Sequence, residues 1–233
     1  MTTVAVLQSN YIPWKGYFDI INSVDLFVWY DNVQYTPQNW RNRNRIKTVN
    51  GMIWLTVPCN GRLGMEIQEV RISEHAWRRK HWASISQAYA HAPYFDEYRD
   101  FFSELYFGGS QESLSDLNHL FIERICRGLL GVDTPFRDAS EFSTEGSGQE
   151  RLLGILEEIS ATTYLSGPGG KDYIDPNLFE ERGITIEWMD YSRYPEYPQL
   201  HGAFEHGVSI LDLLFNVGPD ASKYIWGPQA TSR

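Results

Sequence analysis

Two short apolar runs near the start of the chain end in polar side chains, and this pattern constrains the fold more than any other. Residues 4–7 are apolar and lead into Gln8-Ser9-Asn10, and residues 26–29 are followed by Asp31-Asn32. Between the runs, a turn with proline and glycine precedes residues 17–22, which show apolar positions at helical spacing. The sequence therefore predicts one βαβ unit. Ligands of open α/β sheets bind outside the carboxyl ends of the strands, so we expect a site at these polar residues.

The rest of the chain predicts strands and helices that alternate at both ends, with helices alone in the middle. Expected strands cover residues 52–57, 66–72, 162–165 and 184–189, and residues 136–142 are expected to form a strand or an extended link. Expected helices cover residues 73–91 with Ser73 as the cap, 94–107, 113–130, a segment that ends at 160, 176–182 and 208–215. Residues 33–47 show no apolar period and are expected to form a loop.

These elements favour an α/β fold with an open, mostly parallel sheet of the Rossmann-like type and a helical insertion in the middle of the chain. We expect a first α/β half over residues 1–72, a helical subdomain over 73–132 and a second α/β half over 133–226. Residues 227–233 are expected to form a flexible tail.

Composition narrows the class of partner. The formal net charge is -10, from 20 basic and 30 acidic residues, which argues against a protein that binds duplex nucleic acid. Cys59 and Cys126 lie far apart and match no metal or redox spacing, which favours a reduced, cytoplasmic protein. We also find no apolar stretch of about 20 residues and no basic leader, so no membrane partner and no signal peptide are expected.

The expected loop carries four cations within seven residues, from Arg41 to Lys47. Clustered cations repel one another, and recognition of phosphate or carboxylate by arginine is the physical use of such a cluster. The alternative is a solvated loop whose charges pair with some of the many carboxylates.

Two further segments are candidate anion sites. Residues 10–17 follow the first strand, and a helix that begins there presents free N–H groups beside Lys15. Residues 166–171, Ser-Gly-Pro-Gly-Gly-Lys, follow a later strand but lack the spacing of a phosphate-binding Walker loop. In both cases the alternative is a turn that only redirects the chain.

The histidines fall into two groups. His201 and His206 lie in a glycine-flanked loop, where an imidazole can act as a general base near neutral pH. His75 and His81 are expected to face solvent from an amphipathic helix, and His119 to lie on a helix surface or to be partly buried. The spacing of His201 and His206 matches no zinc site, so no metal is predicted.

Several strings resemble the WbqC-like family. They are LQSNYIPWKGYF at residues 7–18, DNVQY at 31–35 with WRNRN at 40–44, YLSG at 164–167 and SILDLLFNVG at 209–218. The resemblance runs from about residue 4 to about residue 218. It implies a bacterial transferase of O-antigen, lipopolysaccharide or other surface-polysaccharide biosynthesis. It further implies the transfer of glycine or another aminoacyl group to an amino sugar.

The opening unit also resembles the nucleotidylyltransferase-type (HUP) half-motif, in which a His-x-Gly-His turn holds ATP phosphates. Residues 14–17 are Trp-Lys-Gly-Tyr, so only Gly16 matches, and this argues against direct adenylyl transfer. Lys15, Arg41, Arg43 and Lys171 would supply the positive charge instead.

Together these observations predict an enzyme that forms an amide between an amino acid and a nucleotide-linked amino sugar. The donor is free or carrier-bound, and ATP with magnesium is the expected cofactor if the activation occurs in this site. The expected catalytic residues are Asn10, Lys15, Asp31 and His201. The expected substrate-binding residues are Gln8, Tyr11, Trp14, Tyr17, Asn32, Gln34, Tyr35, Trp40, Arg41, Asn42, Arg43, Asn44, Arg45, Ser166, Gly167 and Lys171.

Two other functions remain open at the level of the sequence. A non-catalytic protein that binds or presents a sugar nucleotide would need the same anion site. A nucleic-acid partner using Trp40 and the arginines is disfavoured by the net charge, unless an aminoacyl-tRNA is the donor. The sequence does not determine the oligomeric state, and an oligomer is compatible with it.

Overall fold

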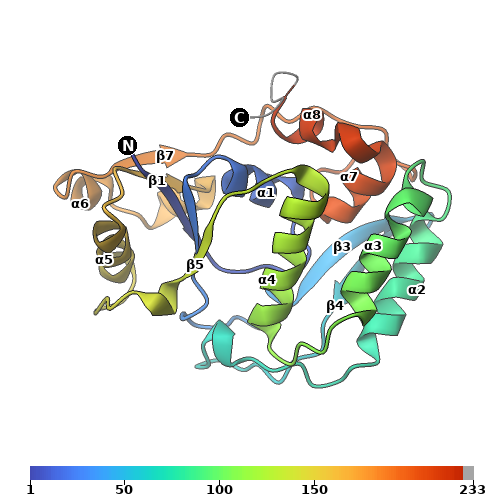
Figure 1. Ribbon diagram of the computed structural model, residues 1–233, viewed down its shortest axis with the longest axis horizontal. Helices are drawn as coiled ribbons and strands as arrows, with labels where there is room; N and C mark the ends of the chain where they lie inside the picture. Colours follow the sequence, from blue (N-terminus) through green and yellow to red (C-terminus); the bar gives the residue numbers. More distant parts are fainter. Residues whose placement is uncertain (228–233) are drawn as a thin grey trace.

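The computed structural model describes residues 1–227, and its larger sheet has five strands in which every neighbouring pair is parallel (Figure 1). The strand order is β5-β2-β1-β6-β7. The strands are β1 (Thr3–Leu7), β2 (Leu26–Trp29), β5 (Phe136–Asp138), β6 (Thr163–Ser166) and β7 (Thr185–Trp188). This confirms the predicted α/β, Rossmann-like fold. The expected tail, apart from Gly227, lies outside the described residues.

The order of the strands places a topological switch point between β1 and β6. The helix α1 (Lys15–Asn22) carries the chain from β1 to β2 in one direction. The helix α5 (Gln149–Ile159) returns it to β6 on the other side of β1, and α6 (Pro176–Glu180) leads on to β7. In such sheets the crevice at the switch point is the usual ligand site.

The central strands are apolar because they are buried on both faces. Ala5 and Phe27 face the core that α1 covers, whereas Val4, Val6 and Val28 face a second core under α5. A strand that is covered on both faces reads as a continuous apolar run, which is why β1 and β2 could be located from the sequence.

The prediction of a loop over residues 33–47 is wrong for its last part, which forms an antiparallel hairpin. Its strands are β3 (Arg43–Thr48) and β4 (Gly51–Thr56). The inward positions of β3 include Asn44, whose side-chain amide donates to the backbone oxygens of Tyr11 at 3.1 Å and Ile12 at 2.8 Å. A buried asparagine breaks the apolar alternation that usually reveals a strand.

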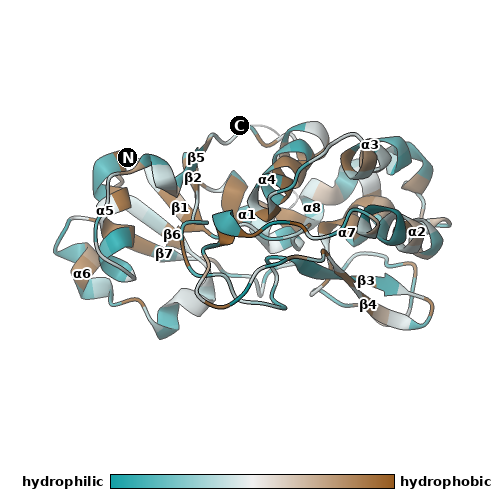
Figure 2. Cartoon of the chain, turned by 90° about the horizontal axis from the view of Figure 1, so that it is seen from below, coloured by the Kyte–Doolittle hydropathy of each residue, from teal (hydrophilic) through white to brown (hydrophobic). Residues whose placement is uncertain are grey.

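Three long helices follow the hairpin: α2 (Trp77–Tyr89), α3 (Phe95–Phe107) and α4 (Leu114–Ile125), which a π-helical turn extends to Leu130. They share one hydrophobic core with α1, α7 (Ile210–Val217) and α8 (Ala221–Ile225), and the structure does not establish a separate helical insertion. The predicted division into three segments stays a prediction. Figure 2 shows the sheet at one end of the molecule and the hairpin beside α2 and α7 at the other.

Two local predictions are wrong. Residues 66–72 form a short 3-10 helix, Ile67–Glu69, because Glu66 and Glu69 make a reciprocal capping box that favours a turn over a strand. The helix α2 begins at Trp77, and Ser73 does not cap it, because the cap position is Ala76, three residues later. No helix among residues 1–227 is long and apolar enough to cross a membrane.

Candidate functional site

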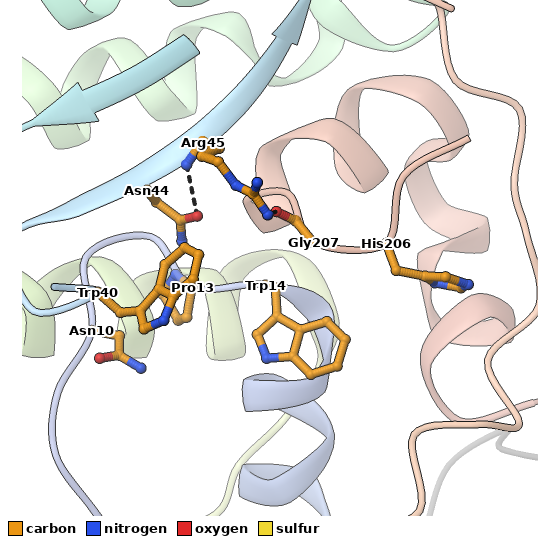
Figure 3. Close-up of a pocket in the computed structure, with 8 residues that line it drawn as sticks. All are labelled: Asn10, Pro13, Trp14, Trp40, Asn44, Arg45, His206 and Gly207. Carbon is orange, nitrogen blue, oxygen red and sulfur yellow. Dashed lines mark hydrogen bonds between the residues drawn. The ribbon is translucent and has the colours of Figure 1, made fainter. Parts of the chain in front are cut away.

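A cavity of about 320 Å³ lies where the turn after β1 meets the start of the hairpin and the loop before α7 (Figure 3). Its lining comes from all three segments: Asn10, Pro13, Trp14, Trp40, Asn44, Arg45, His206 and Gly207. Five of these residues were predicted to contact substrate or take part in catalysis: Asn10, Trp14, Trp40, Asn44 and Arg45. The fold therefore brings together segments that are separated by about 160 residues, as the 162-residue separation of Arg45 and Gly207 shows.

Gly16 shapes one wall of this cavity. A Cβ atom at this position would lie 2.4 Å from the ring of Trp14, so only glycine lets the indole lie over the first turn of α1. The indole then packs edge-to-face with Tyr191 and Tyr194, at centroid distances of 4.8 and 5.8 Å. The turn after β1, which contains Pro13 and Gly16, thus presents the indole of Trp14 to the cavity.

One cation, Arg45, lines the cavity, and Arg41 and Lys15 lie next to residues that line it; all three are bound to neutral oxygens. The guanidinium of Arg41 donates to the side-chain oxygens of Gln8 and Asn10, and Arg45 Nη2 donates to the backbone oxygen of Gly207 at 2.8 Å. Lys15 Nζ donates to the backbone oxygen of Pro195 at 3.2 Å, and it lies 4.8 Å from the ring centroid of Tyr194.

Within residues 1–227, none of Lys15, Arg41, Arg43, Arg45 and Lys47 forms an ion pair with a carboxylate. Some arginines elsewhere in the described residues, such as those at 99, 124, 137 and 182, do form such pairs, whereas those at 62, 71, 78, 79 and 151 do not. In a chain of net charge -10, positive charge that is left without a carboxylate favours an exogenous anion.

Burial lowers the pKa of Lys15 into the range near neutral pH. The residue Lys15 is only 3% exposed, and desolvation of its ammonium lowers its pKa from 10.5 to about 8. The lysine is therefore still protonated at neutral pH, and the binding of an anion would favour that charged form.

Asp31 and His119 form a hydrogen-bonded pair at the end of β2. Asp31 Oδ2 lies 3.0 Å from His119 Nε2, and Oδ1 accepts the backbone N–H of Ser9 at 2.8 Å. The imidazole stacks on Trp29 at a centroid distance of 4.2 Å. Burial raises the pKa of the Asp31 carboxyl, but the hydrogen bonds from His119 and Ser9 outweigh burial and lower it overall. The carboxylate therefore stays ionised and orients the imidazole.

Such a pair can act as a general base, because a carboxylate fixes the tautomer of the imidazole and stabilises its protonated form. The His119 side chain is 17% exposed, so solvent reaches it, whereas Asp31 is buried. Asn118, the neighbour of His119 on α4, donates to Ser9 Oγ at 3.1 Å and to the backbone oxygen of Arg41 at 2.9 Å. These bonds tie the pair to the arginine.

Sequence reasoning missed His119 as a functional residue. It lies 88 positions from Asp31 and has no motif around it, so only the packing of α4 against the strand ends reveals the pair. It also misjudged His81, which was expected to face solvent. His81 is buried, its Nδ1 lies 2.9 Å from the hydroxyl of Tyr11, and desolvation lowers its pKa to about 4.

His201, a predicted base, does not line the cavity. Its Nε2 lies 2.7 Å from the backbone oxygen of Ala88 near the end of α2. His206 lines the cavity instead, and it is exposed.

Three tyrosines that were predicted to bind substrate are buried and have structural contacts. Tyr11 is fully buried, and its hydroxyl lies 2.7 Å from that of Tyr106. Tyr17 donates to the backbone oxygen of Gln8 at 2.9 Å, and Tyr35 packs against Gly61. None of the three lines the cavity, and their hydrogen bonds and packing shape the strand ends instead.

The remaining predicted residues lie around the site rather than in the cavity. Asn32 and Asn42 are buried, the former beside Arg151 and the latter bonded to Val57, and Gln34 is exposed. Arg43 stacks over Trp54 at 4.2 Å.

Ser166 and Gly167 end β6 at the switch point, and Lys171 is exposed above the ring of Trp188 at 5.7 Å. These three residues do not line this cavity. Within residues 1–227, no three His, Cys, Asp or Glu side chains gather closely enough to hold a metal ion. ATP with magnesium stays a prediction.

The fold and site define a class: a Rossmann-like α/β protein with a basic, aromatic cavity beside the carboxyl ends of its strands. The chain belongs to the WbqC-like protein family, whose model matches residues 8–224. An uncharacterized protein of Mycobacterium tuberculosis is 43% identical over 227 residues, which are 97% of this chain and 98% of that protein. No solved structure gave a significant match.

Proposed function

We propose that this protein is an enzyme of bacterial surface-polysaccharide biosynthesis that joins an amino acid to the amino group of a nucleotide-linked sugar. The observation that carries the proposal is a set of cations at or beside the cavity, Lys15, Arg41 and Arg45, none of which forms an ion pair with a carboxylate within residues 1–227. The resemblance to the WbqC-like family supplies the pathway, and the amino acid that it suggests is glycine.

The phosphates of the sugar nucleotide would lie between Arg41 and Arg45. Guanidinium groups bind phosphate oxygens through paired hydrogen bonds, and Arg41 already holds two N–H groups toward the neutral acceptors Gln8 and Asn10. A phosphate can replace these acceptors and gain the charge interaction. Lys15 adds a long-range positive field at neutral pH.

The sugar would pack against the aromatic faces of the cavity. Trp40 is 41% exposed and lines the cavity from the start of the hairpin. Trp14 lines it from the turn after β1. Asn10 and Asn44 also line it, and their amides suit sugar hydroxyl groups.

His119 would act as the general base. As the amine nitrogen attacks the acyl carbon, a C–N bond forms, and the imidazole takes the proton that the nitrogen loses. The bond between the acyl carbon and its activating group then breaks, and that group leaves with the bonding electrons. Asp31 stabilises the imidazolium, and most of the rate comes from positioning. The acyl donor is activated either by ATP in this site or beforehand on another carrier.

The test is to incubate the protein with a uridine-diphosphate-linked amino sugar, glycine and ATP, and in parallel with a pre-activated glycyl donor. Mass spectrometry should detect the sugar nucleotide with one added glycyl group. His119→Gln should abolish this product, whereas His75→Gln, a change at an exposed residue, should not. Equal product from His119→Gln would contradict the assigned base.

A second function, a non-catalytic protein that binds a sugar nucleotide, is favoured by one observation. The turn after β1 carries Trp14 and Tyr17 where HUP enzymes carry histidines. This function predicts that a sugar nucleotide raises the melting temperature while no donor yields a product.

A further inference from the structure

A second cavity, also of about 320 Å³, lies on the other face of the sheet at the same strand ends. Tyr30 contributes to it from the end of β2, Tyr164 from β6 and Leu152 from α5. Tyr164 and Leu152 belong to the core under α5, whereas Trp14 and the first cavity lie on the α1 side. The site described above uses none of these residues.

The position of this cavity matches the switch point between β1 and β6. Its lining spans β1, β2 and β6, so it lies at the crevice where sheets of this topology bind nucleotides. A volume of about 300 Å³ is at the lower end of small-molecule pockets. The cavity therefore suits one small planar group rather than a whole dinucleotide.

Its walls combine flat aromatic surfaces with a few polar groups. Tyr30, Tyr164 and Tyr173 supply rings, and Tyr173 is 68% exposed at the mouth. The side-chain oxygen of Gln149 accepts the backbone N–H of Asp175 at 2.7 Å, which holds this amide at the cavity. The helix α5 begins here after Gly148, whose backbone has φ +58° and supplies no capping side chain.

Arg41 lies beside the first cavity and near a residue of the second. It hydrogen-bonds Asn10, which lines the first, and Tyr173, which lines the second, is one of its electrostatic neighbours. Burial lowers the pKa of the Arg41 guanidinium, and the nearby hydroxyl of Tyr17, carboxylate of Asp31 and hydroxyl of Tyr173 oppose that shift. A phosphate bound at Arg41 would therefore lie beside the first cavity and near Tyr173 at the mouth of the second.

We propose that the tyrosine-lined cavity under α5 binds the nucleobase of a nucleoside diphosphate whose phosphates lie at Arg41. This inference rests on the proposed function, because it assigns the base of the same sugar nucleotide. The ligand then runs from the α5 face, across the ends of β1 and β6, to the indoles of Trp14 and Trp40. The tyrosine rings stack on the base, and the Gln149 amide meets its polar edge.

Calorimetric titrations with inorganic pyrophosphate, uridine diphosphate and adenosine diphosphate test this assignment. Stacking of a base on aromatic side chains should make a nucleoside diphosphate bind about tenfold to a hundredfold more tightly than pyrophosphate, which is about 1.4–2.8 kcal/mol. The difference between the two nucleotides identifies the preferred base.

Three variants separate the base site from the phosphate site. Tyr173→Ala should remove most of the gain from the base and leave pyrophosphate affinity unchanged, and Leu152→Trp should fill the cavity and remove all of it. Phe107→Ala removes another exposed aromatic side chain, 47% exposed on α3, and should change neither affinity. If Leu152→Trp fails to fold, Tyr173→Ala decides the result.

The outcomes distinguish this inference from the proposed function. Equal binding of pyrophosphate and both nucleotides would overturn the base site while the anion site stands. The same holds if Tyr173→Ala and a folded Leu152→Trp both still bind a nucleoside diphosphate more tightly than pyrophosphate, by the wild-type factor. If pyrophosphate does not bind, the proposed function fails, and titration with uridine and adenosine then decides the cavity. Nucleoside binding that Tyr173→Ala weakens would support it, and no nucleoside binding would overturn it.

Discussion

Replacing Lys15 with methionine should make the protein more stable and weaken its binding of anions. Lys15 is 3% exposed and hydrogen-bonds one backbone oxygen, that of Pro195. Methionine has a similar length and loses only the charged end of the side chain. A residue that is retained for binding can cost stability in this way.

The magnitude follows from the pKa. Burial lowers the Lys15 pKa from 10.5 to about 8, and a change of this size corresponds to an upper limit of roughly 3 kcal/mol, because solvent screening reduces the cost. The ammonium also lies near the rings of Tyr194 and Tyr197, at 4.8 and 5.3 Å, and such contacts stabilise a cation by about 0.5–2 kcal/mol. The net gain for Lys15→Met at pH 7 is therefore about 1–3 kcal/mol.

The gain should depend on pH with a defined sign. Below pH 8 the lysine is charged in both the folded and unfolded states, so wild type carries the full cost. Between about pH 8 and 10.5 the folded protein releases the proton while the unfolded chain keeps it, so wild-type stability rises toward that of the variant. Urea unfolding at pH 7 and at pH 9.5 measures both differences.

Lys80→Met is the matched control, because Lys80 is exposed on α2, and its effect should stay within about 0.5 kcal/mol. Pyrophosphate affinity at pH 7 should fall several-fold in Lys15→Met and not in Lys80→Met. A Lys15→Met protein that is less stable than wild type at pH 7, or a gain that does not change with pH, would refute the reasoning.

Three further substitutions have distinct expected effects. His119→Gln should lower kcat about a hundredfold or more and leave sugar-nucleotide affinity nearly unchanged, as parallel kinetic and calorimetric measurements would show. Trp40→Ala should weaken binding of the sugar nucleotide about tenfold without changing pyrophosphate affinity, since it removes a stacking surface; equal losses for both ligands would contradict this role. Gly16→Ala should displace the Trp14 indole, because the new Cβ would lie 2.4 Å from its ring. Denaturant unfolding should then show a loss of about 1–3 kcal/mol, and unchanged indole fluorescence would argue against the displacement.

The parallel sheet could be predicted from the sequence because its strands carry their own signal. The runs at β1, β2 and β6 are short, apolar and followed by polar or glycine residues, and burial on both faces accounts for that pattern. The hairpin could not be predicted in the same way. Its strand β3 places Asn44 inward, and the hydrogen bonds that satisfy this amide come from a turn more than thirty residues earlier.

The candidate site shows the same division. The arginine cluster and the strand-end residues were found because local composition marks them, and the structure places Arg41, Arg45 and Asn10 together. His119 has no such local mark, since its proposed role depends on a contact with Asp31 across the fold. His201 was favoured because it lies in a glycine-flanked loop, but its ring binds a backbone oxygen of α2.

The central claim is that the cavity beside the strand ends binds phosphate through Arg41 and Arg45, and calorimetric titration with pyrophosphate tests it most directly. Wild type should bind, and the double variant Arg41→Ala, Arg45→Ala should lose about a hundredfold or more in affinity while its thermal unfolding stays cooperative. The matched control is Arg99→Ala, Arg124→Ala, which removes two surface arginines that pair with carboxylates and should bind as wild type does. Undiminished binding by the Arg41 and Arg45 variant, or no binding by wild type, would contradict the account.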